Sequence, residues 1–289
     1  MELLHLKYFQ TVAKTEHMTN AAKQLNIVQP ALSRTIISLE KELGVELFDR
    51  TGKSIKLNSN GQLFLKTVDQ TISVLENGIK ELFDINDKSQ QEIKLLVLAG
   101  SNTLCNLILN FRKLYPNITF KLHQHPSCEL DYSDFDFCIS STLDKVTNPN
   151  YINLIEEELF IGIPSNHPLA INDSIFLSEV SNEDFIGFQS DKPFRKISNS
   201  LCQYAGFSPN IVFESDVPSI VRQLIIAGLG ISFIPEISWD ICSDESIKLL
   251  KIIDPICKRY LNLSWHPDNY MNKYAKIFRE FAVNYYSML

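Results

Sequence analysis

The sequence predicts a multi-domain α/β protein with a small helical head, one long helix, and a larger body in which strands and helices alternate. Three observations predict it. Residues 1–44 carry apolar side chains at helical spacing, residues 65–82 carry a heptad repeat, and the chain beyond residue 92 alternates strand-like and helical patterns. A length of 289 residues with 45% hydrophobic content suits two domains with buried cores and excludes a disordered or collagen-like chain.

The first 44 residues predict three helices. The first covers residues 2–14, and the second, with Thr19 as its expected N-cap, runs to about Leu25. After a short connector, a third helix begins near Pro30 and ends at Gly44. Two helices joined this closely form a helix-turn-helix. The apolar stripe expected on the third helix is Ala31, Leu32, Ile36, Leu39 and Leu43.

The segment after Gly44 changes to a strand pattern. Residues 47–50 and 54–57 flank Thr51-Gly52-Lys53, which predicts a hairpin with glycine at its turn. A basic hairpin beside a helix-turn-helix is a wing. Arg50 on its arm and Lys53 near its tip are placed to meet phosphates or the minor groove of DNA.

Polar side chains at the start of the third helix are expected to contact DNA. Gln29 suits adenine, Arg34 suits guanine, and Ala31 suits the methyl group of thymine. The alternative is a solvated helix face, which the neighbouring basic wing disfavours. The expected DNA-binding residues are Thr19, Gln29, Pro30, Ala31, Ser33, Arg34, Arg50 and Lys53.

Asn58 is the expected N-cap of a helix that ends near residue 86 and spans roughly 40 Å. Apolar residues recur along it at intervals of three and four, as in a coiled-coil seam. Packing on the helix's own domain would give the same pattern, but the seam continues past the head and therefore favours a dimer. The expected dimerisation residues are Leu65, Val68, Ile72, Leu75, Ile79 and Leu82.

The net charge of −7 argues at first against binding a polyanion, but the charge is unevenly distributed. Residues 1–66 hold nine Lys and Arg against six Asp and Glu, a balance of +3. The rest of the chain holds 18 and 28, a balance of −10. A basic head on an acidic body is typical of a nucleic-acid-binding module joined to another domain.

Beyond a polar hinge at residues 88–91, alternating patterns predict an α/β body with largely parallel sheets. Such sheets bind ligands at the carboxyl ends of strands, near helix N-termini. Ser101, Asn102 and Thr103 follow a predicted strand and begin a helix, so they can form a seat for a carboxylate or oxyanion. Ordinary helix capping is an equally good explanation. The expected strands are 95–99, 118–122, 135–140, 160–164, 185–188, 211–214 and 231–234, and the expected helices are 102–114, 197–205 and 219–227.

Other classes of site find little support. His123, His125 and Cys128 could ligate a metal, but no fourth ligand is evident, so we expect no metal. Nucleophilic triads, a P-loop and a dinucleotide-binding turn are missing from the sequence, so we expect neither catalysis nor a cofactor. Nothing resembles a signal peptide, and we expect a cytoplasmic protein. The cysteines, expected to be small buried hydrophobes with a redox thiol as the alternative, are Cys105, Cys128, Cys138, Cys202, Cys242 and Cys257.

Motifs along the whole chain resemble the LysR-type transcriptional regulators. The head motifs are Leu6-x-Tyr8-Phe9, Thr19-x-Ala21-Ala22-x-x-Leu25, Gln29-Pro30-Ala31-Leu32-Ser33 and Leu47-Phe48-x-Arg50. The body motifs are Glu157-Glu158-Leu159-Phe160, Pro164-x-x-His167-Pro168-Leu169-Ala170 and Gly228-Leu229-Gly230-Ile231. A pure solute-binding protein is the rival interpretation, and it would need no helix-turn-helix with a wing.

The resemblance implies a winged helix-turn-helix over residues 1–58, a dimerising linker helix over 59–87, and an effector-binding domain over 92–289. That domain would have two α/β lobes like those of periplasmic solute-binding proteins, the first at 92–160 and 266–289 and the second at 161–265. Homodimers that pair into homotetramers would bind interrupted inverted repeats in promoter DNA, with RNA polymerase as a further candidate partner. A small metabolite between the lobes would shift the assembly between states. The implied effector residues, with Asn102 added from the residues alone, are Ser101, Asn102, Thr103, Ser140, Gln189 and Ser219.

Three features depart from the family pattern. Val28 replaces a common serine, so the third helix lacks a hydroxyl N-cap. Asn58-Ser59-Asn60 replaces a threonine-containing entry to the linker helix, at little cost because asparagine also caps. The segment 125–134 is shorter than usual, which predicts a trimmed first lobe.

Overall fold

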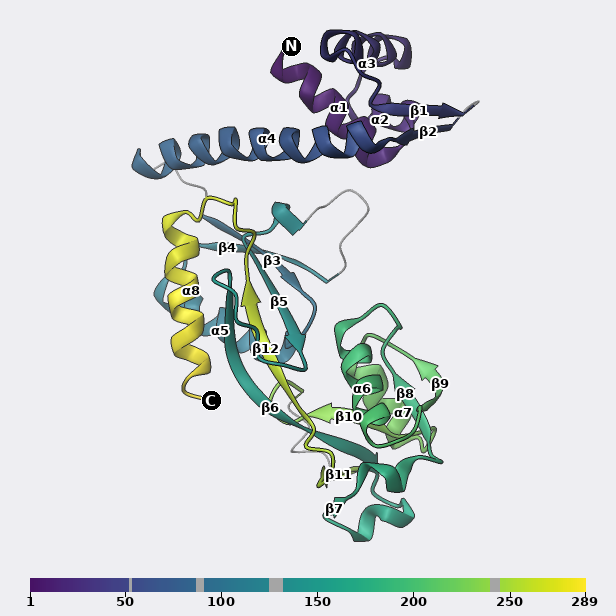
Figure 1. Ribbon diagram of the computed structural model, residues 1–289. Coiled ribbons are helices and arrows are strands. Elements are labelled where there is room, and N and C mark those ends of the chain that lie inside the picture. Colours follow the sequence, from purple (N-terminus) through teal and green to yellow (C-terminus); the bar gives the residue numbers. More distant parts are fainter. Residues whose placement is uncertain (52–53, 87–90, 125–131, 240–244) are drawn as a thin grey trace. The chain divides into compact units, whose positions relative to one another are not determined.

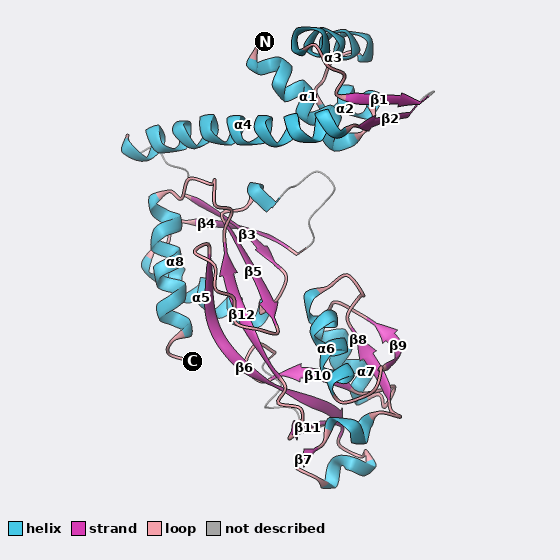
Figure 2. Cartoon of the chain, in the orientation of Figure 1, coloured by secondary structure: helices cyan, strands magenta, loops and turns pink. Residues whose placement is uncertain are grey.

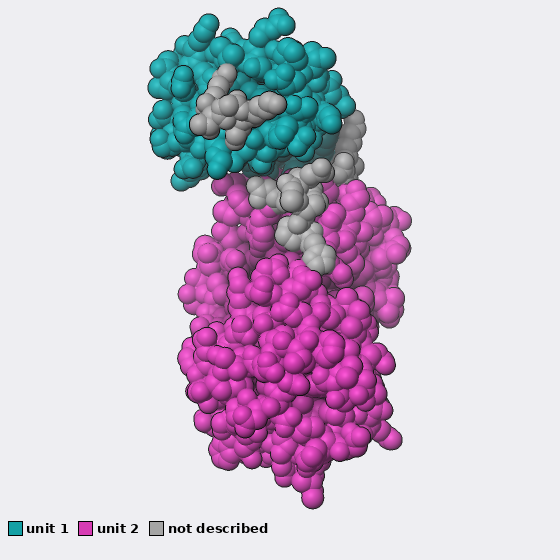
Figure 3. All heavy atoms as spheres, turned by 90° about the vertical axis from the view of Figure 1, so that its right-hand side faces the viewer, with its two compact units in different colours: residues 1–88 teal, residues 89–289 magenta. Residues whose placement is uncertain are grey.

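The computed structural model describes residues 1–51, 54–86, 91–124, 132–239 and 245–289 (Figure 1). The chain folds as two compact units, residues 1–88 and 89–289 (Figure 3). None of the helices in the described ranges has the length and apolar character that a membrane crossing requires. Residues 52–53 of the expected wing turn, residues 88–90 of the expected hinge, and the metal candidates His125 and Cys128 lie outside these ranges.

The first unit begins with three helices whose ends follow local backbone chemistry. Glu16 and Gly44 adopt left-handed backbone conformations directly after the first and third helices, and Pro30 lies in the first turn of the third. Phe9 has no exposed surface and packs on Phe48 and Phe64, which joins the helices to the segments that follow. The helices are α1 Leu3–Thr15, α2 Met18–Gln24 and α3 Gln29–Leu43.

Two expectations for these helices are wrong. The N-cap of α2 is His17, whose Nδ1 accepts a hydrogen bond from the Asn20 N–H at 3.3 Å; Thr19 lies one residue inside the helix and is exposed. A histidine ring nitrogen can accept this bond as a hydroxyl would, and residue 17 already has the extended backbone that a cap requires. Ala31 is exposed and does not belong to the apolar stripe of α3.

A two-stranded antiparallel hairpin, β1 Phe48–Thr51 and β2 Ser54–Leu57, follows α3 and is referred to below as the wing. Buried Glu40 accepts a hydrogen bond from the Leu47 N–H at 2.9 Å and so ties the end of α3 to the residue that precedes the wing. Asn58 caps the next helix, α4 Ser59–Ile85, by accepting a hydrogen bond from the Gly61 N–H at 2.9 Å, as expected.

The apolar seam of α4 divides into two halves. Val68 and Ile72 are buried in the core of the first unit, and Leu65 packs against that core. Farther along the helix, Leu75, Ile79 and Leu82 are 45%, 45% and 60% exposed. Packing on its own unit therefore explains only the first half of the seam.

The second unit contains two lobes, each with its own core (Figure 2). Helices α5 and α8 contribute to the core of the first lobe, and α6 and α7 to that of the second. The helices are α5 Ser101–Leu114, α6 Pro193–Tyr204, α7 Pro218–Ile226 and α8 Lys273–Tyr286, with short 3-10 helices at Tyr132–Asp134, Pro168–Ile171 and Leu177–Val180. The strands are β3 Glu92–Val97, β4 Thr119–His123, β5 Phe137–Thr142, β6 Tyr151–Pro164, β7 Ser174–Ile175, β8 Asp184–Gly187, β9 Asn210–Glu214, β10 Ser232–Pro235, β11 Ile247–Ile252 and β12 Lys258–Ser264.

One eight-stranded sheet, in the order β4-β3-β5-β12-β6-β11-β7 with β10 also on β6, runs through both lobes. Strands β6 and β12 pair antiparallel and pass from one lobe to the other (Figure 1). We call them the crossing strands. β3 pairs in parallel with β4 and β5, and β8 pairs in parallel with β9. The expectation of largely parallel sheets therefore fails at the centre of the sheet.

The crossing strands also move the expected lobe boundary. Leu261 and Leu263 of β12 belong to the core of the first lobe, whereas residues 161–265 were expected in the second. Leu159 and Cys257 belong to the core of the second lobe. The chain thus crosses just before residue 159 and again just after residue 257. Strands β11 and β12 and the first nine residues of β6 were not predicted, because charged residues interrupt their apolar pattern.

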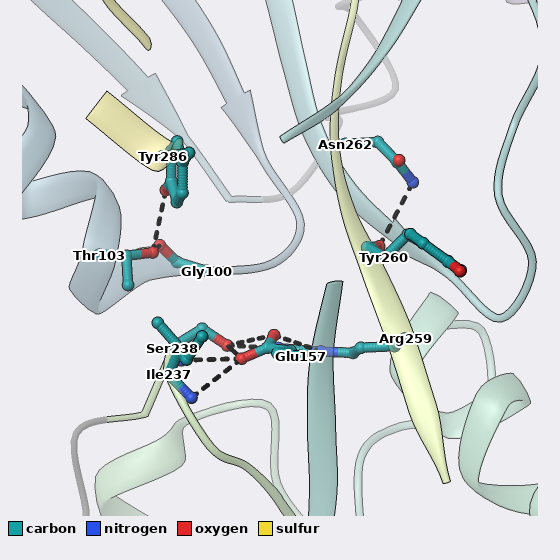
Figure 4. Close-up of polar contacts among 9 residues, drawn as sticks. All are labelled: Gly100, Thr103, Glu157, Ile237, Ser238, Arg259, Tyr260, Asn262 and Tyr286. Carbon is teal, nitrogen blue, oxygen red and sulfur yellow. Dashed lines mark hydrogen bonds and ion pairs between the residues drawn. The ribbon is translucent and has the colours of Figure 1, made fainter. Parts of the chain in front are cut away.

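A buried ion pair lies at the crossing. Arg259 of β12 stands directly opposite Glu157 of β6, and its Nε donates to Glu157 Oε1 at 2.7 Å (Figure 4). The two side chains are 2% and 0% exposed. Glu157 also accepts hydrogen bonds from the N–H groups of Ile237 and Ser238, at 3.1 and 2.9 Å. The Ser238 hydroxyl donates to Glu157 and accepts from Arg259 at 2.6 Å, so the network links both crossing strands to the turn after β10.

Gly61 lies where α4 passes the wing, and a Cβ there would be 2.1 Å from the Leu47 carbonyl oxygen. We predict that Gly61→Ala lowers the free energy of unfolding by about 2 kcal/mol, because backbone must move to admit the methyl group. Gly78 lies in the same helix with open space around it, so Gly78→Ala should be neutral or stabilising by up to about 1 kcal/mol. Urea titration of the helical circular dichroism tests both. Equal effects of the two substitutions would contradict this account.

Glu157→Gln should destabilise the second unit by about 3–5 kcal/mol, because it leaves the Arg259 guanidinium buried without its counter-charge. The matched control is Glu156→Gln on the same strand. Glu156 pairs with Lys258 at the surface, where solvent screens the interaction, and we expect a much smaller effect. The measurement is urea unfolding followed by tryptophan fluorescence. Similar losses of unfolding free energy for both variants would show that burial does not make the Glu157–Arg259 pair more stabilising than the surface pair.

Candidate DNA interface and candidate ligand cavity

The first two turns of α3 present side chains to solvent. Gln29, Pro30 and Arg34 are exposed and Ser33 is partly buried. The opposite face of the helix is anchored in the core by Leu32 and other residues with no exposed surface. The exposed residues therefore share one face at the leading end of a helix whose orientation the core fixes. Val28 forms the N-cap without a side-chain hydrogen bond, as its lack of a hydroxyl implies.

The other expected DNA-binding residues are described less fully. Arg50 lies in β1 opposite Ile55, but its side chain is outside the described part, and Lys53 lies wholly outside it. Thr19 is exposed on α2. The structure thus groups Gln29, Pro30, Ala31, Ser33 and Arg34 at the start of α3, whereas the side chains of Arg50 and Lys53 lie outside the described part.

A cavity of about 140 Å³ lies between the two lobes of the second unit. Its first wall is the end of β3 and the start of α5, from Val97 to Ser101, together with Gln124. Gly100 precedes α5 in a left-handed conformation, and a Cβ there would be 2.9 Å from the Leu261 side chain, so glycine is required by both backbone and space. Ser101 stands in the first turn of α5, where backbone N–H groups favour an anion.

The second wall is aromatic. Phe188, Phe194 and Trp239 pack on one another, with ring centroids 5.2 to 6.1 Å apart. We call these three residues the aromatic wall. The Arg259 guanidinium, which also lines the cavity, lies 4.6 Å from the Phe194 ring centroid. Arg259 of the buried ion pair therefore also forms the cavity floor.

Charged residues of the second lobe complete the lining. Lys192 and Asp216 both line the cavity, with Lys192 Nζ 3.7 Å from Asp216 Oδ2. Their side chains are 12% and 14% exposed. Val217 and Pro218 follow Asp216 at the start of α7. The cavity thus combines an apolar surface with a few charged groups, as is usual for sites that bind small molecules.

Among the six expected effector residues, Ser101 lines the cavity. The amide of Asn102 donates to the Trp239 carbonyl at 3.2 Å. The buried Thr103 hydroxyl donates to the Gly100 carbonyl and accepts from Tyr286, each at 3.0 Å (Figure 4). Burial raises the pKa of Tyr286 to about 12. Asn102 and Thr103 therefore hold the first turn of α5 in place.

The other three expected effector residues lie near the cavity but are not among the described residues that line it. Ser140 is in β5 opposite Asn262, and Gln189 is exposed, with its backbone N–H donating to Asp216 Oδ1 at 2.9 Å. Ser219 is exposed on the first turn of α7. The residues that sequence reasoning missed are Phe188, Lys192, Phe194, Asp216, Trp239 and Arg259. Phe188 and Asp216 lie close in sequence to the expected Gln189 and Ser219, whereas Arg259 lies on a strand that was not predicted.

Metal and redox chemistry find no support in the described part of the chain. The His123 ring packs on Phe135, and the described residues contain no group of three metal-ligating side chains. Burial raises the pKa of Cys138 to about 11 and those of Cys202 and Cys257 to about 12, so these thiols stay protonated at neutral pH. Cys105 is exposed, contrary to expectation, and Cys128 and Cys242 lie outside the described ranges.

Comparison with known families matches both units. Residues 3–62 match the bacterial regulatory helix-turn-helix proteins of the lysR family, and residues 88–287 match the LysR substrate binding domain. The HTH-type transcriptional regulator YybE of Bacillus subtilis (strain 168) is 36% identical over 99% of this chain and all of its own. The transcriptional dual regulator GltC of the same organism is 29% identical over 100% and 99%.

Solved structures share the fold. A full-length OxyR variant from Pseudomonas aeruginosa superposes with a TM-score of 0.68 at 20% identity, covering 100% of this chain and 95% of its own. The regulator CbnR in complex with its target DNA gives 0.62 at 20% identity, covering 99% and 100%. The effector binding domain of QuiR in complex with shikimate gives 0.58 at 26% identity, covering 68% and 97%.

Both units, their order along the chain, and the relatives that match over its full length lead to the same conclusion. The protein is a transcriptional regulator. The chain belongs to the LysR family of DNA-binding transcriptional regulators and carries that family's effector-binding domain.

Proposed function

We propose that the leading end of α3 enters the major groove of promoter DNA and reads its sequence. The observation that carries this proposal is the exposed polar face at the leading end of α3, on a helix anchored by its opposite side. A recognition helix of a helix-turn-helix contacts base edges with its N-terminal residues. Residues 1–58 form the proposed DNA-binding domain and 59–87 the linker helix.

Each residue of the proposed interface has a role that follows from its chemistry. Gln29 would pair with adenine and Arg34 with guanine, while Ala31 would meet a thymine methyl group, with Pro30 small enough to permit close approach. Ser33, Thr19 and the wing residues Arg50 and Lys53 would hold phosphates, which fix the register of the protein but carry little sequence information.

The exposed half of the α4 seam supports dimerisation. Leu75, Ile79 and Leu82 continue the heptad beyond the part that packs on the first unit. Two chains paired along α4 would present two recognition helices, which suits an inverted repeat in which one half-site mirrors the other. We infer that the working assembly is a pair of such dimers, a homotetramer on an interrupted inverted repeat, acting in the cytoplasm and within reach of RNA polymerase.

The cavity between the lobes is the proposed effector site, and its ligand a small carboxylate or oxyanion. Ser101 and the first N–H groups of α5 offer an anion seat on one wall, and the opposite side carries the Lys192–Asp216 pair and Arg259, whose charge Glu157 balances. A ligand that prefers one arrangement of the lobes would shift the population of DNA-bound assemblies. The related QuiR domain, described in complex with shikimate, supports a small molecule at this kind of domain.

Arg34→Ala tests the DNA interface. We expect it to weaken binding to the chain's own upstream region by about 1–3 kcal/mol, because the bidentate contact to guanine is lost. The measurement is footprinting at a fixed moderate salt concentration. The control Arg34→Lys keeps the charge but not the fork of donors, so a phosphate contact would survive it and a base contact would not. No protected dyad, or no effect of Arg34→Ala, would refute the proposal.

Ile79→Glu tests the dimer. A charge in the middle of the exposed seam should convert dimers to monomers in sedimentation analysis at micromolar concentration, since the seam would have to bury it. Lys80→Glu introduces the same side chain next to the seam on an exposed position and should leave assembly unchanged. Dimers that persist with Ile79→Glu would place the interface elsewhere.

A further inference from the structure

Asp216, in the turn between β9 and α7, holds a buried acceptor beside the cavity. Its Oδ1 accepts a hydrogen bond from the Gln189 N–H at 2.9 Å. Its Oδ2 is buried and accepts no hydrogen bond from the described residues, and it lies 3.7 Å from Lys192 Nζ. Asp216 also lines the cavity. Buried polar atoms in folded proteins are nearly always hydrogen-bonded, and Lys192 is ion-paired with this oxygen from beyond hydrogen-bond distance, so Oδ2 can still accept a hydrogen bond from a ligand.

Helix capping does not explain Asp216. The N-cap of α7 is Val217, and no side chain caps that helix end. A serine or aspartate held there for capping would accept from an N–H of the first turn, whereas Oδ2 accepts from none among the described residues. The Gln189 backbone and the ion pair with Lys192 therefore hold the carboxylate, and Oδ2 keeps the capacity to accept a hydrogen bond.

The charges around the cavity decide what that partner is. Arg259 is already neutralised by Glu157, and Lys192 lies beside Asp216. A ligand with a second anionic group would place it against Asp216 in a poorly solvated site, where like charges repel strongly. A hydroxyl or ammonium group would instead donate to Oδ2.

The opposite wall suits an acid group. Ser101 lines the cavity in the first turn of α5, a helix of 14 residues, where the N–H groups and the helix dipole favour a carboxylate. A volume of about 140 Å³ restricts the ligand to a small molecule. The carboxylate and the hydrogen-bond donor of the ligand must therefore lie on one short carbon skeleton.

We propose that the cavity recognises a small acid that also carries a hydroxyl or ammonium group, with its carboxylate at Ser101 and its donor on Asp216 Oδ2. This rests on the proposed effector site and narrows its ligand class. Plain carboxylates and dicarboxylates are excluded as preferred ligands, because neither supplies the donor. A hydroxy acid and an amino acid share the required chemistry, and the experiment separates them.

The test is titration calorimetry on the full-length protein with acids of matched skeleton: propionate, 2-hydroxypropionate and 2-aminopropionate, the same set on longer chains, and succinate. For the chain length that binds, we expect the hydroxy acid or the amino acid to bind at least about tenfold more tightly than the plain acid. This ratio corresponds to the usual strength of a hydrogen bond to a charged group. Asp216→Asn should remove that preference and leave the plain acid unchanged. The control Glu214→Gln changes a carboxylate that pairs with Arg195 outside the cavity lining and should have no effect.

The outcomes separate the two claims. The donor requirement would be overturned if plain acids bind as tightly as the matching hydroxy and amino acids and Asp216→Asn changes no affinity. That result would leave the anion seat standing. No binding by any member, or binding that Ser101→Ala does not weaken, would overturn the anion seat as well. The preference for acids that carry a donor is measured first on the unmodified protein. Misfolding of a variant therefore cannot hide a negative result.

Discussion

The buried pair of Glu157 and Arg259 is the interaction on which the second unit depends. A charge buried at this depth is tolerated only when its partner and its hydrogen bonds are all in place. Here the partner comes from the other crossing strand, and further hydrogen bonds come from the turn at Ile237 and Ser238. The network therefore fixes three segments at the point where the chain passes between lobes.

The crossing strands position part of the cavity lining. Arg259 belongs to the pair and to the floor of the cavity at once, and its guanidinium lies over Phe194 of the aromatic wall. The first wall, at the start of α5, is held separately by Thr103 and Tyr286. A ligand that touches both walls would thus bind differently to different arrangements of the two lobes, and an effector-responsive regulator needs this difference.

The sequence predicted those elements whose ends depend on local chemistry. Pro30 and Gly44 bound α3, and Asn58 begins α4, because caps and left-handed positions are properties of neighbouring residues. Ser101 was found for the same reason, since it marks a helix N-terminus. The crossing strands were missed, because their charged residues make sense only when paired. Arg259 lies 102 residues from Glu157, and no local pattern connects them.

The central claim is that this pair holds the crossing locally, and amide hydrogen exchange in the unmodified protein and in Glu157→Gln tests it most directly. We predict that the amides of residues 155–159 and 257–261 exchange slowly in the unmodified protein and faster in the variant, by a factor at least about tenfold larger than the acceleration that the overall destabilisation causes in β3 and α6. Unchanged exchange at the crossing, or an equal acceleration throughout both lobes, would contradict the claim.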